Sequence, residues 1–328
     1  MRPESGRFGR AVDALLGGLT LGLLGATALG LFARAHWLCE LFAHFAVQGL
    51  AAAVVLAVLW FVRRRPGRAL ACGIAAVPHG LALGAWGVAP PTSVPEGLPR
   101  VRVASANLLT SNTAHAAFLA WVRAERPDVV VALEVGRDWA LALEALQDLY
   151  PRRVFAARED NFGVAALASN PAAELEAFVC GPADVPSLRI RVPVAAAGPG
   201  DGATITVVGT HPIPPISAAR AAERDAQIGA CADALLQAPS PRILAGDLNA
   251  TPWAPVLVDL RARTGLRDSR AGFGLQASWP SGWAILGIPI DHLLHDADLA
   301  VIDRRVGPDI GSDHRPVVAD FAVLPGTP

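Results

Sequence analysis

Ile243-Leu244-Ala245-Gly246-Asp247-Leu248-Asn249-Ala250-Thr251-Pro252 is the stretch of this chain that best indicates its fold. The apolar residues at its start predict a short buried strand, which Asp247 and Asn249 follow two positions apart. Residues i and i+2 of an extended chain point to the same side, so a carboxylate and an amide face one spot at the strand end. A carboxylate binds a hard cation or orients a water, and an amide donates to a phosphoryl oxygen. The alternative interpretation is an ordinary Asp/Asn turn after a strand.

Other predicted strands of the same region also end in polar residues. Strands are predicted at 101–106, 129–133, 164–168, 188–194, 204–209, 290–294 and 317–321, with helices at 114–125, 139–149 and 218–237. The polar residues at or beside their ends are Asn107, Glu134, His211, Asp291 and the tract Ser312-Asp313-His314-Arg315. Alternating strands and helices predict an α/β fold, and α/β folds build their sites at strand ends. Several such residues at successive strands predict one shared site.

Composition divides the chain into two parts. Of 328 residues 52% are hydrophobic, the mean hydropathy is +0.39, and the apolar excess lies in residues 1–90. Residues 1–100 hold nine Arg and four acidic residues, a net charge of +5, and the other 19 Arg and 25 acidic residues give −6. An acidic globular part lacks the general attraction of a basic domain to nucleic acid, although a local basic groove remains open. We predict a membrane anchor with linker at 1–95 and a globular domain at 96–328.

Three apolar runs predict three transmembrane helices, at about residues 11–33, 37–62 and 69–89. The first run is long enough to cross a hydrocarbon core of about 30 Å. A signal peptide is its alternative, because Arg2, Arg7 and Arg10 precede it, but its length and the later runs favour an uncleaved anchor. The third run is the weakest, because it contains Pro78 and His79.

The distribution of Arg orients these three helices. Arg residues precede the first run and fill the loop 63–68, whereas the loop between the first two runs holds only Arg34. The positive-inside rule then places the N-terminus and the loop 63–68 in the cytoplasm. Three crossings predict that the globular domain lies outside the cytoplasm of a multi-pass membrane protein. In that compartment Cys180 and Cys231 could form a disulfide, but the sequence does not show whether they are close.

The ordered set of motifs resembles the endonuclease/exonuclease/phosphatase superfamily, which has the DNase I-like fold. The matching segments are Ser105-Ala106-Asn107, Leu133-Glu134-Val135, Gly209-Thr210-His211, Gly246-Asp247-Leu248-Asn249, Ile290-Asp291-His292 and Ser312-Asp313-His314-Arg315-Pro316. Each motif is weak alone, but together they follow the order of the family over residues 101–323. The resemblance implies a four-layer α/β/β/α sandwich, preceded here by the three transmembrane helices.

The resemblance also implies roles for individual residues. Glu134 is the expected main ligand of Mg²⁺, with Mn²⁺ as an alternative ion, and Asn107 and Asp313 lie close to it. Asp247 is expected to orient or deprotonate the attacking water, and Asn249 and His211 to hold phosphoryl oxygens. His314 is expected to face the phosphorus while Asp291 holds its ring. Which of Asp247 and His314 is the base stays open.

Three functions are compatible with these features. The first is a membrane-tethered, Mg²⁺-dependent phosphoesterase that cleaves a phosphodiester or phosphoanhydride outside the cytoplasm. The layout resembles membrane-anchored members linked to glycopeptide resistance, which implies a lipid-linked phosphate of the undecaprenyl type as substrate and the bilayer as partner. The second is an extracytoplasmic metal-dependent nuclease, for which Arg152, Arg153 and Arg158 are candidate contacts. The third is a catalytically silent binding module.

Overall fold

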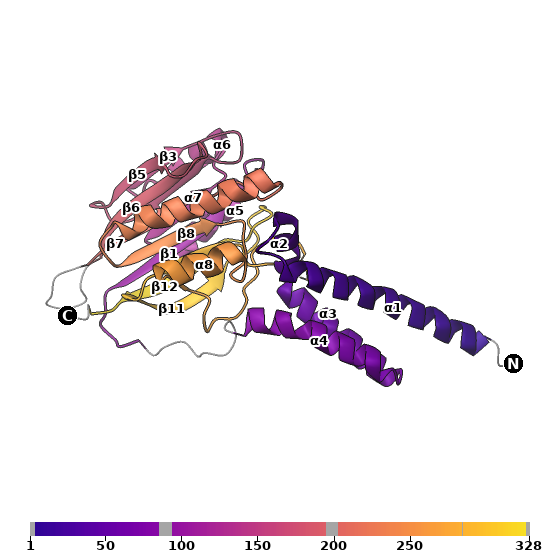
Figure 1. Cartoon of the computed structure of the whole chain (residues 1–328). Coiled ribbons are helices and arrows are strands. Elements are labelled where there is room, and N and C mark those ends of the chain that lie inside the picture. The colour runs from indigo at the N-terminus through magenta and orange to yellow at the C-terminus, as the bar shows by residue number, and fades with distance from the viewer. Residues whose placement is uncertain (1–3, 85–93, 195–202, 284, 326–328) are drawn as a thin grey trace. The chain divides into compact units, whose positions relative to one another are not determined.

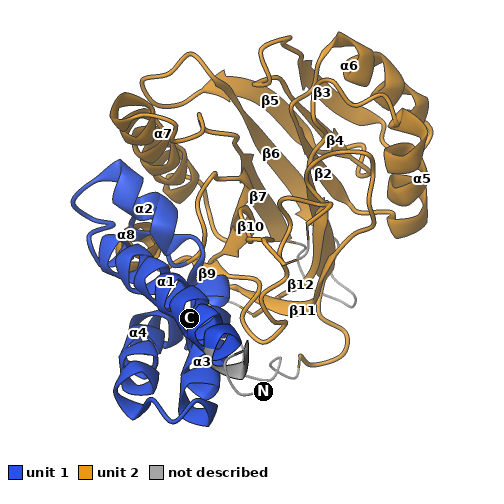
Figure 2. Ribbon diagram, turned by 90° about the vertical axis from the view of Figure 1, so that its right-hand side faces the viewer, with its two compact units in different colours: residues 1–85, 253–255 blue, residues 86–252, 256–328 orange. Residues whose placement is uncertain are grey.

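The computed structural model of the chain describes residues 4–84, 94–194, 203–283 and 285–325 (Figure 1). The chain divides into two compact units, Met1–Ala85 with Trp253–Pro255, and Trp86–Pro252 with Val256–Pro328 (Figure 2). The predicted boundary between residues 95 and 96 remains a prediction.

The first unit is helical. Its helices are α1 (Glu4–Leu31), α2 (Trp37–Ala43), α3 (Ala46–Val62) and α4 (Pro66–Leu83). α3 packs against α4, and buried Trp60 donates from Nε1 to Thr20 Oγ1 on α1 at 2.8 Å. Asp13 on α1 accepts a hydrogen bond from Arg63 Nε at 2.8 Å, which explains how α1 holds an acidic residue near its start.

The prediction of three transmembrane helices is wrong. Of the described helices, one is long and apolar enough to cross a membrane, Arg7–Leu31 within α1. A second crossing is obtained only if α2 and α3 count as one span, but they meet at an angle of 60°. At that break the side chains of Glu40 and His44 are buried inside the unit, 4.0 Å apart. Arg68 and His79 reduce the apolar character of α4, which contains Pro78 within the helix, and the predicted third span ends in residues outside the described ones.

The second unit is built on two six-stranded mixed sheets. The first sheet has the order β11-β12-β1-β2-β4-β3 and the second the order β5-β6-β7-β8-β10-β9. The strands of the first sheet are β1 (Arg100–Asn107), β2 (Val129–Leu133), β3 (Arg152–Ala156), β4 (Val164–Ala168), β11 (Leu299–Val306) and β12 (Val317–Val323). The strands of the second are β5 (Glu174–Val179), β6 (Pro186–Val194), β7 (Ala203–Gly209), β8 (Arg242–Asp247), β9 (Arg267–Asp268) and β10 (Asp291–His295).

The hydrophobic core lies between the two sheets. Alternate residues of β1 and β2, such as Val103 and Val131, pack in one buried cluster with Ile205, Val207 and Ile243 of the second sheet. The residues of opposite parity on β1, β2 and β4 pack in another cluster with α5 (His115–Glu125) and α6 (Arg137–Leu143). This double use follows from the period of two in a strand, which allows β1, β2 and β4 to bury both faces.

Helices cover the outer faces of both sheets, which produces four layers. α5 and α6 cover the first sheet, and α7 (Ala218–Leu236) packs on β7 and β8 of the second (Figure 1). Two shorter helical segments complete the unit, α8 (Pro255–Thr264) and a 3-10 turn (Glu144–Leu146). The expected α/β/β/α sandwich of the DNase I-like fold is therefore present.

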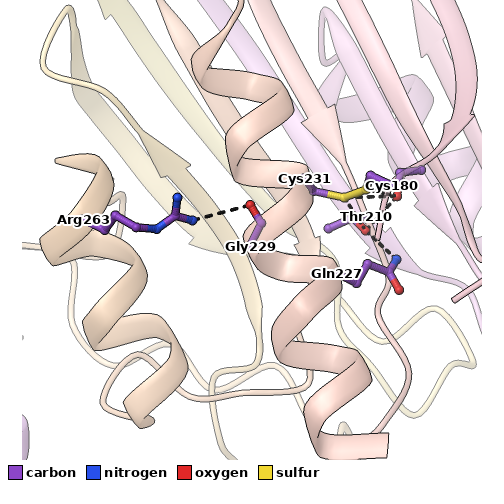
Figure 3. The surroundings of a disulfide bond; sticks show 7 residues. Cys180, Thr210, Gln227, Gly229, Cys231 and Arg263 are labelled. Carbon is purple, nitrogen blue, oxygen red and sulfur yellow. Dashed lines mark hydrogen bonds between the residues drawn. A yellow bond between two sulfur atoms is a disulfide. The ribbon is translucent and has the colours of Figure 1, made fainter. Parts of the chain in front are cut away.

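A disulfide joins α7 to the loop after β5. Cys180 and Cys231 are bonded, with their Cα atoms 5.6 Å apart (Figure 3). Buried Thr210 lies beside the bond, where its Oγ1 accepts a hydrogen bond from Gln227 Nε2 at 3.0 Å and contacts Ser187 Oγ at 2.9 Å. The disulfide between Cys180 and Cys231, which the sequence left open, is therefore present and lies next to Thr210, the residue before His211.

Candidate active site

Two parallel strands of the first sheet place Asn107 and Glu134 side by side. Asn107 ends β1 and pairs in register with Leu133, so Glu134 is the next residue beyond β2. Asn107 Nδ2 donates to Glu134 Oε1 at 2.8 Å, and the backbone N–H of Thr110 approaches the other carboxylate oxygen at 3.4 Å. Glu134 has a left-handed backbone, with φ at +55°, and is 9% exposed.

Asp247 at the end of β8 lies at the centre of the site. Its Oδ2 has three neighbours, namely Asn107 Nδ2 at 3.2 Å, His211 Nε2 at 3.4 Å and His314 Nε2 at 3.5 Å. Its Oδ1 accepts a hydrogen bond from the backbone N–H of Asn249 at 2.9 Å. Burial favours the neutral acid, but the charge of His314 and the hydrogen bond from His211 hold the pKa of Asp247 below its ordinary value. Asp247 is therefore an anion at neutral pH.

Asp291 and His314 form a buried pair next to Asp247. Asp291 lies directly opposite Asp247 on β10, the antiparallel neighbour of β8. Two carboxylates in such a cross-strand pair repel each other and destabilise the sheet unless a positive group lies between them. His314 Nδ1 lies 2.9 Å from Asp291 Oδ2, and its Nε2 faces Asp247, so the ring bridges the two carboxylates. Burial disfavours the charged ring, but Asp291 and Asp247 outweigh it and raise the pKa of His314 to about 10. His314 is therefore an imidazolium at neutral pH.

His211 is the second histidine that contacts Oδ2 of Asp247. Burial lowers its pKa, but the hydrogen bond with Asp247 and the charges of Asp247 and Glu134 have the larger combined effect and raise the pKa above its ordinary value. Its Nδ1 is buried without a hydrogen-bond partner among the described residues. The ring of Phe162 lies 5.7 Å away, tilted by 40°.

Close backbone packing positions Asp247 and His211 relative to each other. Gly246 has φ at +143°, and a Cβ built on it would lie 1.9 Å from the carbonyl oxygen of Thr210. Only glycine fits this position, because β7 and β8 approach each other there as they deliver their site residues. Asn249 follows in a left-handed conformation with φ at +49°.

Asn249 and Asp313 both make hydrogen bonds within the protein. Asn249 Nδ2 donates to Pro212 O at 3.0 Å, so one of its two amide hydrogens is used within the protein. Asp313 is exposed and accepts a hydrogen bond from Trp279 Nε1 at 3.1 Å, and the described contacts do not join it to Asn107 or Glu134. Its charge acts instead on neighbouring His314, whose pKa it helps to raise.

Two groups of donor atoms could hold a metal ion. Asp247, Asp291 and His314 offer ligand atoms within 4.8 Å of one another. The imidazolium of His314, however, already offsets one of the two carboxylate charges in this group. Glu134 is a buried carboxylate with no ion-pair partner within 4 Å among the described residues, a state that is costly without a cation. With Asn107 beside it, Glu134 has the oxygen chemistry that Mg²⁺ and Mn²⁺ prefer.

Some contacts of the site were missed in the sequence. Thr110 uses its hydroxyl to hold the backbone carbonyl of Glu134 at 3.1 Å, and nothing in its sequence context marks it. Trp279 donates from its Nε1 to Asp313 Oδ2 at 3.1 Å. The hydrogen bonds that hold Glu134 and Asp313 are set by the fold and not by local sequence patterns.

Comparison with known proteins identifies the fold. The model of the "Endonuclease/Exonuclease/phosphatase family" matches residues 104–314, well over half of the chain. A solved structure of an endonuclease/exonuclease/phosphatase from Beutenbergia cavernae is 21% identical and has a TM-score of 0.52, with 69% of this chain and 72% of that chain covered. No curated protein matches the chain.

Two eukaryotic structures share the same fold. The human Nocturnin catalytic domain, solved with a bound sulfate, is 18% identical with a TM-score of 0.52, covering 69% of this chain and 94% of that one. D. rerio TDP2, solved with a single-strand DNA product, is 16% identical with a TM-score of 0.53, covering 68% of this chain and 99% of that one. At these identities the likeness concerns the fold alone. The family consists of metal-dependent hydrolases of phosphoesters. From the extent of its match, this chain belongs to the endonuclease/exonuclease/phosphatase family.

Proposed function

We propose that the chain is a Mg²⁺-dependent hydrolase that cleaves a phosphodiester or phosphoanhydride bond. The observation that carries this proposal is the buried carboxylate of Glu134, which has no cationic partner within 4 Å among the described residues and lies beside two histidines and two further carboxylates. Glu134 and Asn107 would hold the ion, which when bound neutralises charge on phosphoryl oxygens. Mn²⁺ has compatible ligand preferences.

The charges of the described residues suit in-line attack on a phosphoryl group. Asp247, an anion of lowered pKa, accepts a hydrogen bond from the attacking water and orients it. His314 is already protonated, so it cannot serve as the first base and instead places positive charge beside the phosphoryl oxygens. His211, whose pKa is also raised, supplies a proton to the leaving oxygen. This assignment favours Asp247 over His314 as the group that receives the proton of water.

The proposed location is outside the cytoplasm, with α1 as a membrane tether. The disulfide between Cys180 and Cys231 supports this location, because disulfides persist in oxidising compartments and are rare in the cytosol. The apolar segment Arg7–Leu31 supports the tether. A C-terminal fusion to a phosphatase reporter that works only outside the cytoplasm tests both; an inactive but stably expressed fusion contradicts the location.

An apolar loop beside the site favours a substrate with a lipid part. Trp283 is 67% exposed and Ile285 is 87% exposed, in the loop that follows Trp279. The base of this loop is bonded to the His314 segment, since Ser281 donates from its hydroxyl to Ser312 O and from its backbone to Asp313 O, both at 2.7 Å. Exposed clusters of large apolar side chains commonly mark binding surfaces. A lipid-linked phosphate, such as one of the undecaprenyl type, would present an apolar chain to this loop while its phosphate enters the site.

A nuclease is the second candidate. The bound single-strand DNA product in the TDP2 structure shows that the fold can serve that chemistry. The arginines that the sequence offered for DNA contacts are, however, used within the protein. Arg152 donates to Ala173 O, Arg153 pairs with Glu144, and Arg158 pairs with Asp160. This internal pairing disfavours a basic groove at those positions.

The function is tested with the full chain purified in detergent. A polyprenyl pyrophosphate, bis(p-nitrophenyl) phosphate and a single-stranded oligonucleotide are assayed with Mg²⁺, with Mn²⁺ and with a chelator. We expect metal-dependent turnover of the lipid substrate, and we expect Glu134→Gln to raise the Mg²⁺ concentration that gives half-maximal rate. Glu174→Gln, a change of the same kind on an exposed strand, is the matched control and should behave as wild type. Cleavage of DNA alone would reject the lipid substrate, and no turnover of any compound would reject the phosphoesterase.

A further inference from the structure

Two arginines are fully buried behind the Asp291–His314 pair. Arg270 follows β9 and is 1% exposed, and Arg304 in the middle of β11 is 2% exposed. A buried guanidinium is costly unless its charge and its donors are matched. Arg270 is matched by Asp268, to which its Nε donates at 3.0 Å. Arg304 has no carboxylate within 4 Å among the described residues, so its burial requires another explanation.

Arg304 connects the two sheets directly behind Asp291. It belongs to the first sheet, and its donors reach residues associated with the second sheet. Its Nε donates to Ser269 Oγ at 3.1 Å, and one terminal nitrogen approaches the backbone carbonyl of Asp291 at 3.4 Å. The other terminal nitrogen donates to Gln276 Oε1. Burial lowers the pKa of Arg304, whereas the charges of Asp268 and Asp291 partly offset that effect.

The Asp291–His314 pair also spans the two sheets. Asp291 begins β10 of the second sheet, whereas His314 lies in the connection between β11 and β12 of the first. Their separation of 2.9 Å therefore depends on the distance between the sheets at this end of the sandwich. Arg304 bridges that same gap through the backbone of Asp291. Arg304 therefore joins β11, the strand that precedes His314, to the backbone of Asp291, which is the hydrogen-bond partner of His314.

Arg270 makes a similar connection to the loop after β8. Its terminal nitrogen lies 2.8 Å from His292 Nδ1, and His292 Nε2 lies 2.7 Å from the backbone carbonyl of Ala250. A carbonyl can only accept and a guanidinium can only donate, so these contacts assign His292 as the neutral ring protonated at Nε2. Ala250 is the residue after Asn249. Arg270 thus reaches the loop that follows Asp247 through one intervening ring.

We infer that Arg304 is a positioning residue that sets the contact between Asp291 and His314, with Arg270 and His292 supporting the adjacent loop. This inference rests on the proposed function, because it assigns Arg304 a role in the same chemistry without contact to the substrate. The competing explanation is that Arg304 stabilises the sandwich and has no specific effect on the site.

A double-mutant cycle separates the two explanations. We expect Arg304→Gln in the full chain to lower kcat by about 10- to 100-fold, the size expected when reacting groups are misplaced, with little change in KM. In a His314→Ala background the same change should cost less than about 3-fold, because the contact that it sets is already absent. An equal loss in both backgrounds overturns the inference.

A matched control and a milder variant guard against a simple folding defect. Arg102 is a partly buried arginine on β1 that pairs with Asp320, five residues before Asn107 and so toward the other end of the strand. Arg102→Gln should lower the melting temperature and leave kcat near wild type; a comparable loss of kcat contradicts the inference. If Arg304→Gln does not fold, Ser269→Ala removes one acceptor of Arg304 and should give a smaller loss of kcat that also disappears in the His314→Ala background.

A spectroscopic readout keeps the inference testable if no substrate is turned over. The hydrogen on Nδ1 of His314 should give a downfield proton resonance, which is identified by its absence in His314→Ala. We expect Arg304→Gln to shift or broaden this resonance and Arg102→Gln to leave it in place. An unchanged resonance in folded Arg304→Gln refutes the positioning role, whatever the outcome of the activity assays.

Discussion

Replacing Asp291 with Asn tests whether the charge of His314 is essential for the reaction. The change keeps the shape of the side chain and removes one of the two carboxylates that the ring bridges. The remaining carboxylate, Asp247, lies farther away, at 3.5 Å instead of 2.9 Å. We expect His314 in Asp291→Asn to lose its proton at a much lower pH.

The size of the effect follows from the pKa of His314. It rises from 6.5 to about 10, and at about 1.36 kcal/mol per pH unit this rise of about 3.5 corresponds to roughly 5 kcal/mol in favour of the charged ring. Asp291 is the largest of the three carboxylate contributors, ahead of Asp247 and Asp313, so its loss should lower the pKa by about 2. The raised pKa of His314 also makes the stability of the fold depend on pH. The stabilisation from the charged ring is fully present below pH 6.5 and is lost as the pH rises through about 10.

The assay is kcat as a function of pH between 6 and 11, with wild type and Asp291→Asn compared on one substrate. Both proteins should be active near pH 6.5, where the ring is charged in each. The alkaline limb of the variant should lie about 2 pH units below that of wild type, a direction and size set by the lost carboxylate. The reasoning is refuted if the two alkaline limbs coincide while kcat of the variant is lower at every pH.

Three further predictions concern the framework of the site. Gly246→Ala should destabilise the protein by at least about 2 kcal/mol, because the new methyl group meets the Thr210 carbonyl, whereas Gly282→Ala, in open space, should leave the melting temperature unchanged. Cys231→Ser opens a disulfide that spans 51 residues, for which chain entropy predicts a loss of roughly 4 kcal/mol, and a reducing agent should then have no further effect on the melting temperature. Trp283→Ser should raise KM for a polyprenyl pyrophosphate several-fold without affecting bis(p-nitrophenyl) phosphate, and an equal effect on both would contradict contact with a lipid chain.

The strand ends of the second unit could be predicted because their signal is local. A run of apolar residues that stops at Asn107, Glu134 or Asp247 indicates a buried strand that delivers one polar group, and the structure brings these three together. The ionisation of His314 could not be derived in this way. It depends on the register that places Asp291 opposite Asp247, and register is a long-range property of the sheets.

Two other features of the structure also depend on long-range packing. Arg304 follows Asp303 and precedes Arg305, so it reads as one member of an exposed charged run, and only the pairing of the two sheets shows that it is buried. The three transmembrane helices are predicted from three long apolar runs. The apolar character of a run reveals neither the 60° break between α2 and α3 nor the burial of Glu40 inside the helical unit.

The left-handed backbones of Glu134 and Asn249 have a consequence for the evolution and engineering of this protein. A left-handed backbone costs about 1 to 2 kcal/mol for a residue such as Glu134 and less for Asn249, because Asn tolerates this conformation better than other residues with a side chain. Glycine at either position would relax the backbone but remove a side chain for which we propose or expect a role in the reaction. A search for thermostable variants would therefore be drawn to residues 134 and 249, and its gains there would come at the expense of turnover. In this protein the demands of stability and chemistry conflict at two identifiable backbone angles, so stabilising substitutions are better sought elsewhere.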